Sequence, residues 1–193
     1  MKKLTKEISN CTLCASYLSH EPRPVFTFHP KSKIVIIGQA PGTVVHNTGI
    51  PWNDKSGDNL RKWMDIDSSQ FYNVEDFAII PMGFCYPGKG KSGDLPPRPE
   101  CAPAWHDKLH DQLKHVNLTL LIGQYAQAYY LENKRQRNLT ETVRHYTNYA
   151  PQFIPLPHPS PRNRFWMAKN PWFASEIIPH LQSRIKSILN AKN

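Results

Sequence analysis

Lys33-Ile-Val-Ile-Ile-Gly-Gln-Ala-Pro-Gly42 is the stretch that decides the fold of this 193-residue chain. Its first half, residues 33–37, is a short apolar run rich in β-branched side chains, which predicts a buried strand of a parallel sheet. Residues 38–42 hold two glycines and a proline and predict a tight turn that brings bare backbone close to a ligand. Ligands of open α/β sheets bind at the carboxyl ends of the strands, so we expect a site here. An ordinary turn is the alternative for this pentapeptide alone.

Three further apolar runs predict the other strands of the same sheet. These strands are expected over residues 77–81, 118–123 and 153–156. Helices are expected over residues 54–64, from residue 102 onwards, over 124–131, and along the stripe Ile177, Leu181, Ile185 and Ile188. Strands that alternate with helices predict an α/β fold, a three-layer α/β/α sandwich with a central four-stranded parallel sheet. The length fits a single domain over residues 1–193.

Composition and charge narrow the class of protein. The chain has 24 Lys and Arg against 15 Asp and Glu, a net charge of +9 that favours a polyanionic partner such as nucleic acid. No run approaches the roughly 18 apolar residues of a membrane span. The first residues carry charge with no apolar stretch behind them, which is not the pattern of a secretory leader. We therefore expect a cytoplasmic monomer that has no membrane partner.

Four cysteines form a second pattern. Cys11 and Cys14 are separated by two residues, and Cys85 and Cys101 by fifteen. In a cytoplasmic chain such cysteines are ligands rather than disulfides. Four thiolates from two distant parts of a chain suit a tetrahedral zinc or a 4Fe–4S cluster. A zinc ribbon would have a second close pair, so the spacing favours iron–sulfur; unrelated free cysteines are the alternative.

These residues resemble the uracil-DNA glycosylase superfamily, most closely its iron–sulfur families 4 and 5, from Cys11 to about Asn163. The turn 38–42 is similar to the first motif, which lies against the uracil. The stretch His158-Pro-Ser-Pro-Arg-Asn163 is similar to the second motif. Pro51-Trp-Asn-Asp-Lys-Ser-Gly-Asp-Asn-Leu60 is similar to the segment that supplies an aromatic ring to stack on uracil. The cysteine pattern is similar to that of families whose 4Fe–4S cluster is structural.

The resemblance implies a monofunctional DNA glycosylase of base excision repair. Such an enzyme flips out a deaminated base, hydrolyses its N-glycosidic bond and leaves an abasic site. The implied base-binding residues are Gly38, Gln39, Ala40, Trp52, Asn53 and His158. The implied DNA-binding residues are Ser160, Arg162, Asn163 and Arg164. The implied ligands of a 4Fe–4S cluster, with zinc as the alternative, are Cys11, Cys14, Cys85 and Cys101.

Three residues are predicted to be catalytic: His158, Asp54 and Gln39. Bond breaking puts negative charge on the departing uracil, and the imidazole of His158 together with backbone N–H groups would stabilise that charge. Some families place a water-activating carboxylate third in the first motif, where this chain has Ala40, and family 4 places a glutamate second, at Gln39. Family 5 uses an aspartate that matches Asp54. We predict Asp54 as general base or electrostatic stabiliser, with a helix N-cap as the alternative and Gln39 or backbone groups then placing the water.

The base to be excised is left open by one departure from the family. Its base-reading asparagine falls on Pro81, which has no side-chain donor or acceptor and no N–H. Base choice then falls to Gln39, Asn53, Asn47 or backbone groups. Uracil is the predicted base, and a deaminated base such as hypoxanthine is the alternative.

Basic and aromatic residues follow His158 closely over 162–166. Such a sequence suits a loop that contacts phosphates and wedges into the space left by the flipped base, with a solvated basic turn as the alternative. Lys89 and Lys91 are further candidates for a backbone contact, whereas the basic segment 132–144 indicates a solvated face.

Two other classes of function remain open. One is a module of the same fold that binds uracil-containing DNA without turnover, which would fit the absence of a carboxylate at both Gln39 and Ala40; a variant of it is trapped covalently on the abasic sugar through His158. The other is a cluster-bearing nucleic-acid protein with a structural or redox role.

Overall fold

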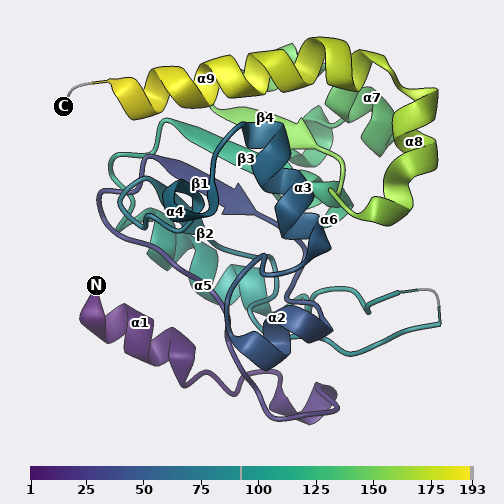
Figure 1. Cartoon of the computed structure of the whole chain (residues 1–193). Coiled ribbons are helices and arrows are strands. Elements are labelled where there is room, and N and C mark those ends of the chain that lie inside the picture. Colours follow the sequence, from purple (N-terminus) through teal and green to yellow (C-terminus); the bar gives the residue numbers. More distant parts are fainter. Residues whose placement is uncertain (92, 192–193) are drawn as a thin grey trace.

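The computed structural model describes residues 1–91 and 93–191. A four-stranded parallel sheet in the order β2-β1-β3-β4 lies between two layers of helices (Figure 1). The strands are β1 (Ile34–Ile37), β2 (Phe77–Ile79), β3 (Leu118–Ile122) and β4 (Phe153–Leu156). The predicted fold class is confirmed, and each predicted strand is present with ends shifted by no more than two residues.

The apolar run of β1 is continuous because both of its faces are covered. All four of its side chains are fully buried. Ile34 and Ile36 join the core that includes Leu60 and Leu181, whereas Val35 and Ile37 join the opposite core with Leu109. Burial on both faces is what a central strand of a parallel sheet requires, and it explains why this strand shows no polar alternation.

The longer helices are those predicted from apolar spacing, together with one at the amino end. They are α1 (Lys2–Ser9), α3 (Lys55–Met64), α5 (Cys101–His110), α6 (Gly123–Leu131) and α9 (Ile178–Asn190), which continues a π-helical turn over Phe173–Ile177. Residues of α3 and α9 pack on one face of the sheet, and residues of α1, α5 and α6 on the other. No helix in the described residues is long and apolar enough to cross a membrane.

Four shorter helices were not predicted: α2 (Thr43–Thr48), α4 (Ser68–Phe71), α7 (Leu139–Arg144) and α8 (Arg164–Lys169). The prediction of a loop over 162–166 is wrong from Arg164 onwards. No helix breaker occurs between Arg164 and Lys169, and Trp166 anchors α8 by donating its indole N–H to Thr140 at 2.9 Å. For α7 the missed signal is Asn138, which caps the helix by accepting from the Glu141 N–H at 2.9 Å.

A buried polar chain lies behind the end of β2. His106 Nε2 lies 3.1 Å from the Pro81 carbonyl oxygen, which only accepts, so this nitrogen carries the proton. Its Nδ1 therefore accepts from the Tyr130 hydroxyl at 2.6 Å, and that hydroxyl accepts from His110 Nε2 at 2.8 Å. The chain of donors runs from His110 through Tyr130 and His106 to the backbone at Pro81.

This chain predicts a loss of stability in mild acid. Burial lowers the pKa of the fully buried His106 from 6.5 to about 4. Between these two values the unfolded chain binds a proton that the folded chain does not, so stability falls as the pH drops from 6.5 to 4, by about 3 kcal/mol for this group. Denaturant unfolding at several pH values measures this. In His106→Leu that part of the pH dependence should be absent; equal acid sensitivity of the two proteins would contradict the assignment.

Candidate active site

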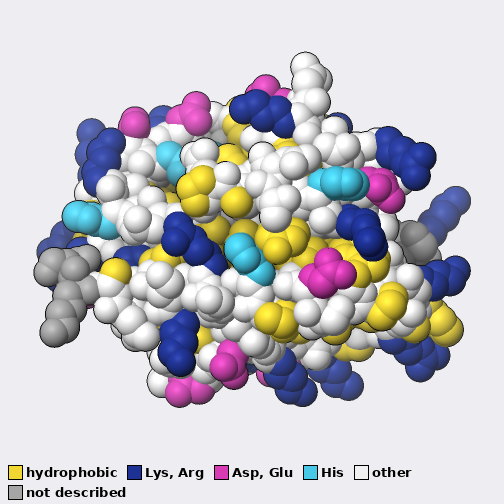
Figure 2. All heavy atoms as spheres, turned by 90° about the horizontal axis from the view of Figure 1, so that it is seen from above, with side chains coloured by type: hydrophobic (Ala, Val, Ile, Leu, Met, Phe, Trp, Pro, Cys, Tyr) yellow, Lys and Arg dark blue, Asp and Glu magenta, His cyan; other side chains and the backbone are white. Residues whose placement is uncertain are grey.

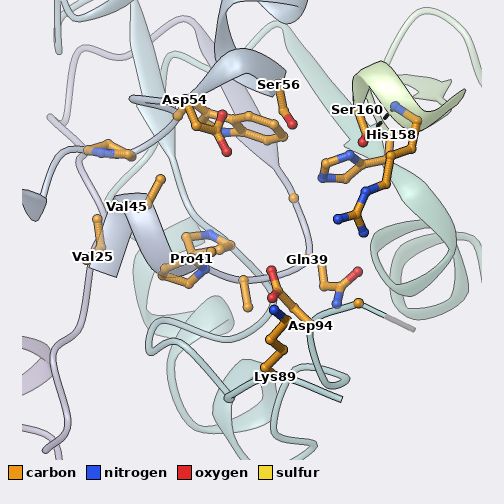
Figure 3. A pocket seen from close by; sticks show the side chains of 18 of the residues that line it. Val25, Gln39, Pro41, Val45, Asp54, Ser56, Lys89, Asp94, His158 and Ser160 are labelled. Atoms are coloured by element: carbon orange, nitrogen blue, oxygen red, sulfur yellow. Dashed lines mark hydrogen bonds between the residues drawn. The ribbon is translucent and has the colours of Figure 1, made fainter. Parts of the chain in front are cut away.

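A cavity of about 550 Å³ opens at the carboxyl ends of the strands (Figure 3). Its walls come from segments far apart in the chain: residues 38–42, 51–56, 79–81, 89–91, 93–94 and 158–162 all contribute, together with Val25 and Val45. The turn that follows β1 thus lies in the wall of this cavity. Position and size are those of a small-molecule or base site in an open α/β sheet.

The structure brings most of the predicted site residues together. Those that line the cavity are Gly38, Gln39, Ala40, Trp52, Asp54, His158, Ser160 and Arg162, with Pro81 beside them. Asn53 instead lines a shallow outer depression with Lys55 and Asp58. Asn163 belongs to a smaller pocket behind His158, and Arg164 lies over the ring of Phe165 at 4.9 Å.

Trp52 is held in a strained backbone conformation. Its φ of 56° lies in the left-handed region, which a bulky side chain rarely adopts. Two glycines make room for it: a Cβ on Gly38 would lie 2.8 Å from the indole, and one on Gly57 only 1.7 Å from the Trp52 carbonyl oxygen. Arg61 also donates to that oxygen, at 3.3 Å. Strain kept by several neighbours at once is typical of functional sites.

His158 lies beside this tryptophan, with ring centroids 5.7 Å apart and planes at 34°. Two amides hold its backbone: Asn163 donates to the His158 carbonyl at 2.7 Å, and Asn59 of α3 to the Pro159 carbonyl at 2.9 Å. Burial lowers the pKa of His158, and the carboxylates of Asp54 and Asp94 oppose this without reversing it. At neutral pH the ring is therefore neutral and can donate one N–H into the cavity.

Asp54 serves as the N-cap of α3 and also lines the cavity. One carboxylate oxygen accepts from the Gly57 N–H at 2.8 Å. The carboxylate group has room for further hydrogen bonds, because capping uses only part of its acceptor capacity. The two roles predicted for Asp54 are therefore compatible in one side chain.

The structure adds a second carboxylate that sequence reasoning missed. Asp94 lines the cavity from a hairpin in the long segment between Cys85 and Cys101, together with Lys89 (Figure 3). Glycines at 88, 90 and 93 signal a turn in this segment. No signal in the sequence indicates which cavity the hairpin borders.

The four cysteines lie in one region of the fold. Burial raises the pKa of Cys85 to about 11 and that of Cys101 to about 12, and the other thiols add to both shifts. The Cys101 sulfur accepts a hydrogen bond from the Phe84 N–H at 3.3 Å. An all-sulfur donor set suits a zinc or iron–sulfur site in its chemistry. As they stand, no three His, Cys, Asp or Glu side chains of the described residues are arranged to hold a metal ion.

Positive charge is spread over the surface rather than gathered in one patch on the face that Figure 2 shows. Lys and Arg side chains lie both at the edge of that face and nearer its centre, with apolar side chains between them (Figure 2). Three cationic side chains border the cavity itself: Lys89, Lys91 and Arg162. A polyanion that binds at the cavity would thus contact these three cationic side chains at its rim.

Fold and site together define a class of protein: a three-layer α/β protein with a ligand-sized cavity, an aromatic ring and a neutral histidine at the carboxyl ends of its strands. The model of the Uracil DNA glycosylase superfamily matches residues 25–182, and the chain belongs to this superfamily. Membership indicates a function of the uracil-DNA glycosylase type, with DNA as partner. Among solved structures, a Methanosarcina acetivorans protein provisionally named a uracil DNA glycosylase is 13% identical, over 82% of this chain and 98% of that chain, with a TM-score of 0.46.

Proposed function

We propose that this protein is a monofunctional DNA glycosylase that acts as a monomer and excises a deaminated base. The main proposed substrate base is uracil. The observation that supports this best is the pair formed by Trp52 and His158. An aromatic ring and a neutral N–H donor lie side by side in one cavity, over the bare backbone of Gly38. A flipped base needs these two things, a stacking surface and a hydrogen bond to the oxygen that gains charge.

In the proposed reaction Trp52 stacks on the flipped base and His158 donates its N–H to O2. The bond between C1′ of the sugar and N1 of the base breaks, and its electron pair leaves with the base. Water adds to C1′, and Asp54 accepts its proton. The base anion is stabilised at O2 and finally takes a proton from solvent. Each role assigns a group to the place where charge develops in the transition state.

DNA binding is assigned to residues at the rim of the cavity. Lys91 and Arg162 would contact phosphates, and Ser160 holds the Arg162 backbone by accepting its N–H at 3.2 Å. Phe165 at the start of α8 is 67% exposed, and the guanidinium of Arg164 covers its ring at 4.9 Å. An exposed aromatic ring next to cations suits insertion into the gap left by the flipped base.

Asp54→Asn separates catalysis from capping. Asparagine caps helices about as well as aspartate, so the free energy of unfolding should change by no more than about 0.5 kcal/mol. The negative charge is lost, so single-turnover excision should slow by about 100-fold or more. Asp54→Ala is the matched variant and should lose about 1 kcal/mol of stability as well. Full activity in Asp54→Asn would return Asp54 to capping alone.

We also propose that the four cysteines hold a 4Fe–4S cluster, with zinc as the alternative. When bound, the group would supply a structural cross-link between residues 11–14 and the segment 85–101. The residues that would hold it are Cys11, Cys14, Cys85 and Cys101. The support is their common location and the all-sulfur donor set that the four thiols offer.

Metal content tests this assignment. Protein isolated without oxygen should be brown, with a broad visible absorbance band and about four irons per chain. Cys11→Ser, at one of the two half-buried members of the set, should lose the band and lower the denaturation midpoint. Stoichiometric zinc without visible absorbance would select the alternative. Both assignments would be contradicted if the wild-type protein contained no metal and Cys11→Ser were as stable as the wild type.

The proposed function is tested on single- and double-stranded oligonucleotides that carry one uracil or one hypoxanthine, followed by alkaline cleavage of abasic sites. We expect cleavage at uracil. Tight binding without cleavage would favour the binding module, and a protein–DNA adduct on a denaturing gel would favour covalent trapping. Neither binding nor cleavage would contradict all three.

A further inference from the structure

The floor of the cavity offers no polar side chain at the place where the resemblance expects one to read the base. Pro81 lines the cavity but has no N–H and no side-chain donor or acceptor. Its carbonyl oxygen already accepts from the buried His106, at 3.1 Å. The groups that distinguish one base from another must therefore come from another wall.

A hairpin places two opposite charges side by side on that other wall. Lys89 and Asp94 are partners in an antiparallel bridge. The backbone bonds flank the pair: Gly90 N–H to the Gly93 carbonyl at 2.6 Å, and Leu95 N–H to the Gly88 carbonyl at 2.9 Å. Lys89 and Asp94 thus form the non-hydrogen-bonded type of pair, in which side chains share a face and approach most closely. Both line the cavity (Figure 3).

Three contacts fix Asp94 against the first-motif turn. The Gln39 amide donates to the Leu95 carbonyl at 3.1 Å. The Tyr86 hydroxyl reaches an Asp94 carboxylate oxygen at 3.4 Å and itself accepts from Thr43 at 3.1 Å. The other Asp94 oxygen lies only 3.3 Å from where a Cβ on Gly42 would stand, so glycine at 42 makes room for it. The carboxylate is therefore held at a set place beside the cavity.

Lys89 and Asp94 remain available to a ligand. None of the ion pairs found in residues 1–91 and 93–191 joins them to each other or to another residue. An ionised carboxylate only accepts hydrogen bonds and an ammonium only donates them. Together they present one acceptor next to one donor, as a single asparagine amide would.

We propose that Lys89 and Asp94 jointly read the Watson–Crick edge of the flipped base, a specificity role that rests on the proposed function. Asp94 accepts the ring N–H of the base and Lys89 donates to the neighbouring carbonyl. Uracil, with N3–H and O4, and hypoxanthine, with N1–H and O6, fit this pair. Cytosine and adenine present the reverse pattern, an unprotonated ring nitrogen next to an amino group, and are rejected.

The test compares Asp94→Asn and Lys89→Met with Lys91→Met, a neighbouring lysine assigned to phosphate. Single-turnover excision and equilibrium binding are measured on otherwise identical single-stranded oligonucleotides carrying uracil, hypoxanthine or cytosine. Asp94→Asn and Lys89→Met should each lower the preference for uracil over cytosine by about 10-fold to 100-fold. Lys91→Met should weaken binding equally for all three bases and reduce the dependence of affinity on salt by about one unit of slope.

Two results would overturn the proposal. If Asp94→Asn slows excision but leaves the preference for uracil over cytosine unchanged, Asp94 takes part in bond breaking and does not read the base. If Lys89→Met, like Lys91→Met, weakens binding equally for all three bases and lowers the salt dependence of affinity by the same amount, Lys89 is a phosphate contact. If the wild type excises no base, the proposed function fails by itself. The ratio of binding affinities for uracil and cytosine oligonucleotides, in wild type and variants, then decides whether the pair reads the base.

Discussion

Replacing His158 with alanine is expected to slow uracil excision by about 100-fold to 1,000-fold, the effect of removing one preorganised donor from an oxyanion site. The imidazole is a neutral donor in the cavity wall, and it lies next to the aromatic ring on which the base would stack. Its donation strengthens as charge moves onto O2, so the loss should appear in kcat more than in KM. Single-turnover rates with a uracil-containing oligonucleotide measure it.

The rest of the site should survive this substitution. The Asn163 and Asn59 amides contact backbone carbonyls of the second motif, not the imidazole, so the motif keeps its place. His115→Ala removes an exposed histidine that is absent from the cavity wall and should leave the rate unchanged. A His158→Ala protein that binds uracil DNA and cleaves at the wild-type rate would remove the histidine from the mechanism.

Gly57→Ala is expected to destabilise the fold by about 2–3 kcal/mol and to abolish most activity. In an ordinary helix this change stabilises by about 0.5–1 kcal/mol, so the expected sign is reversed. The reason is contact with backbone: the new Cβ would lie 1.7 Å from the Trp52 carbonyl oxygen, which no side-chain rotation relieves. The first turn of α3 and the strained Trp52 must move apart, and Asp54 moves with them.

Denaturant unfolding and the excision assay measure the two effects on the same protein. Ser183→Ala is the matched control, an alanine introduced at an exposed position of α9, and should leave stability equal or slightly higher. A Gly57→Ala protein as stable and active as the wild type would show that Trp52 does not depend on the close approach of α3.

Much of the fold can be predicted from local sequence, because a strand that is buried on both faces of the sheet is a nearly continuous apolar run. The run 34–37 is apolar throughout and the run 118–122 is apolar except for the buried Thr119, as a central parallel strand requires. The stripe of α9 follows for the same reason. The short helices α2, α4, α7 and α8 escape such reasoning, since four to six residues carry too little periodicity and tertiary contacts such as that of Trp166 stabilise them.

The site could be predicted only where a motif ties chemistry to a turn. Residues 38–42 and His158 follow strand ends and were found in this way. Asn53 was predicted to bind the base on the strength of the resemblance, yet the positive φ of Trp52 and the start of α3 place Asn53 in an outer depression. Asp94 and Lys89 reach the cavity through a hairpin whose direction depends on Gln39, Tyr86 and Gly42. Contacts between segments so distant in sequence leave no local pattern.

Whether the protein is a glycosylase is decided by measuring free base and abasic sites together, with uracil-containing oligonucleotide in excess over protein. A glycosylase that turns over releases free uracil and leaves abasic sites in equal amounts, and both should exceed the amount of protein several-fold. Free uracil that stops at one equivalent per protein, with the DNA retained on the protein, would contradict turnover. Binding without any release of uracil would contradict bond breaking altogether.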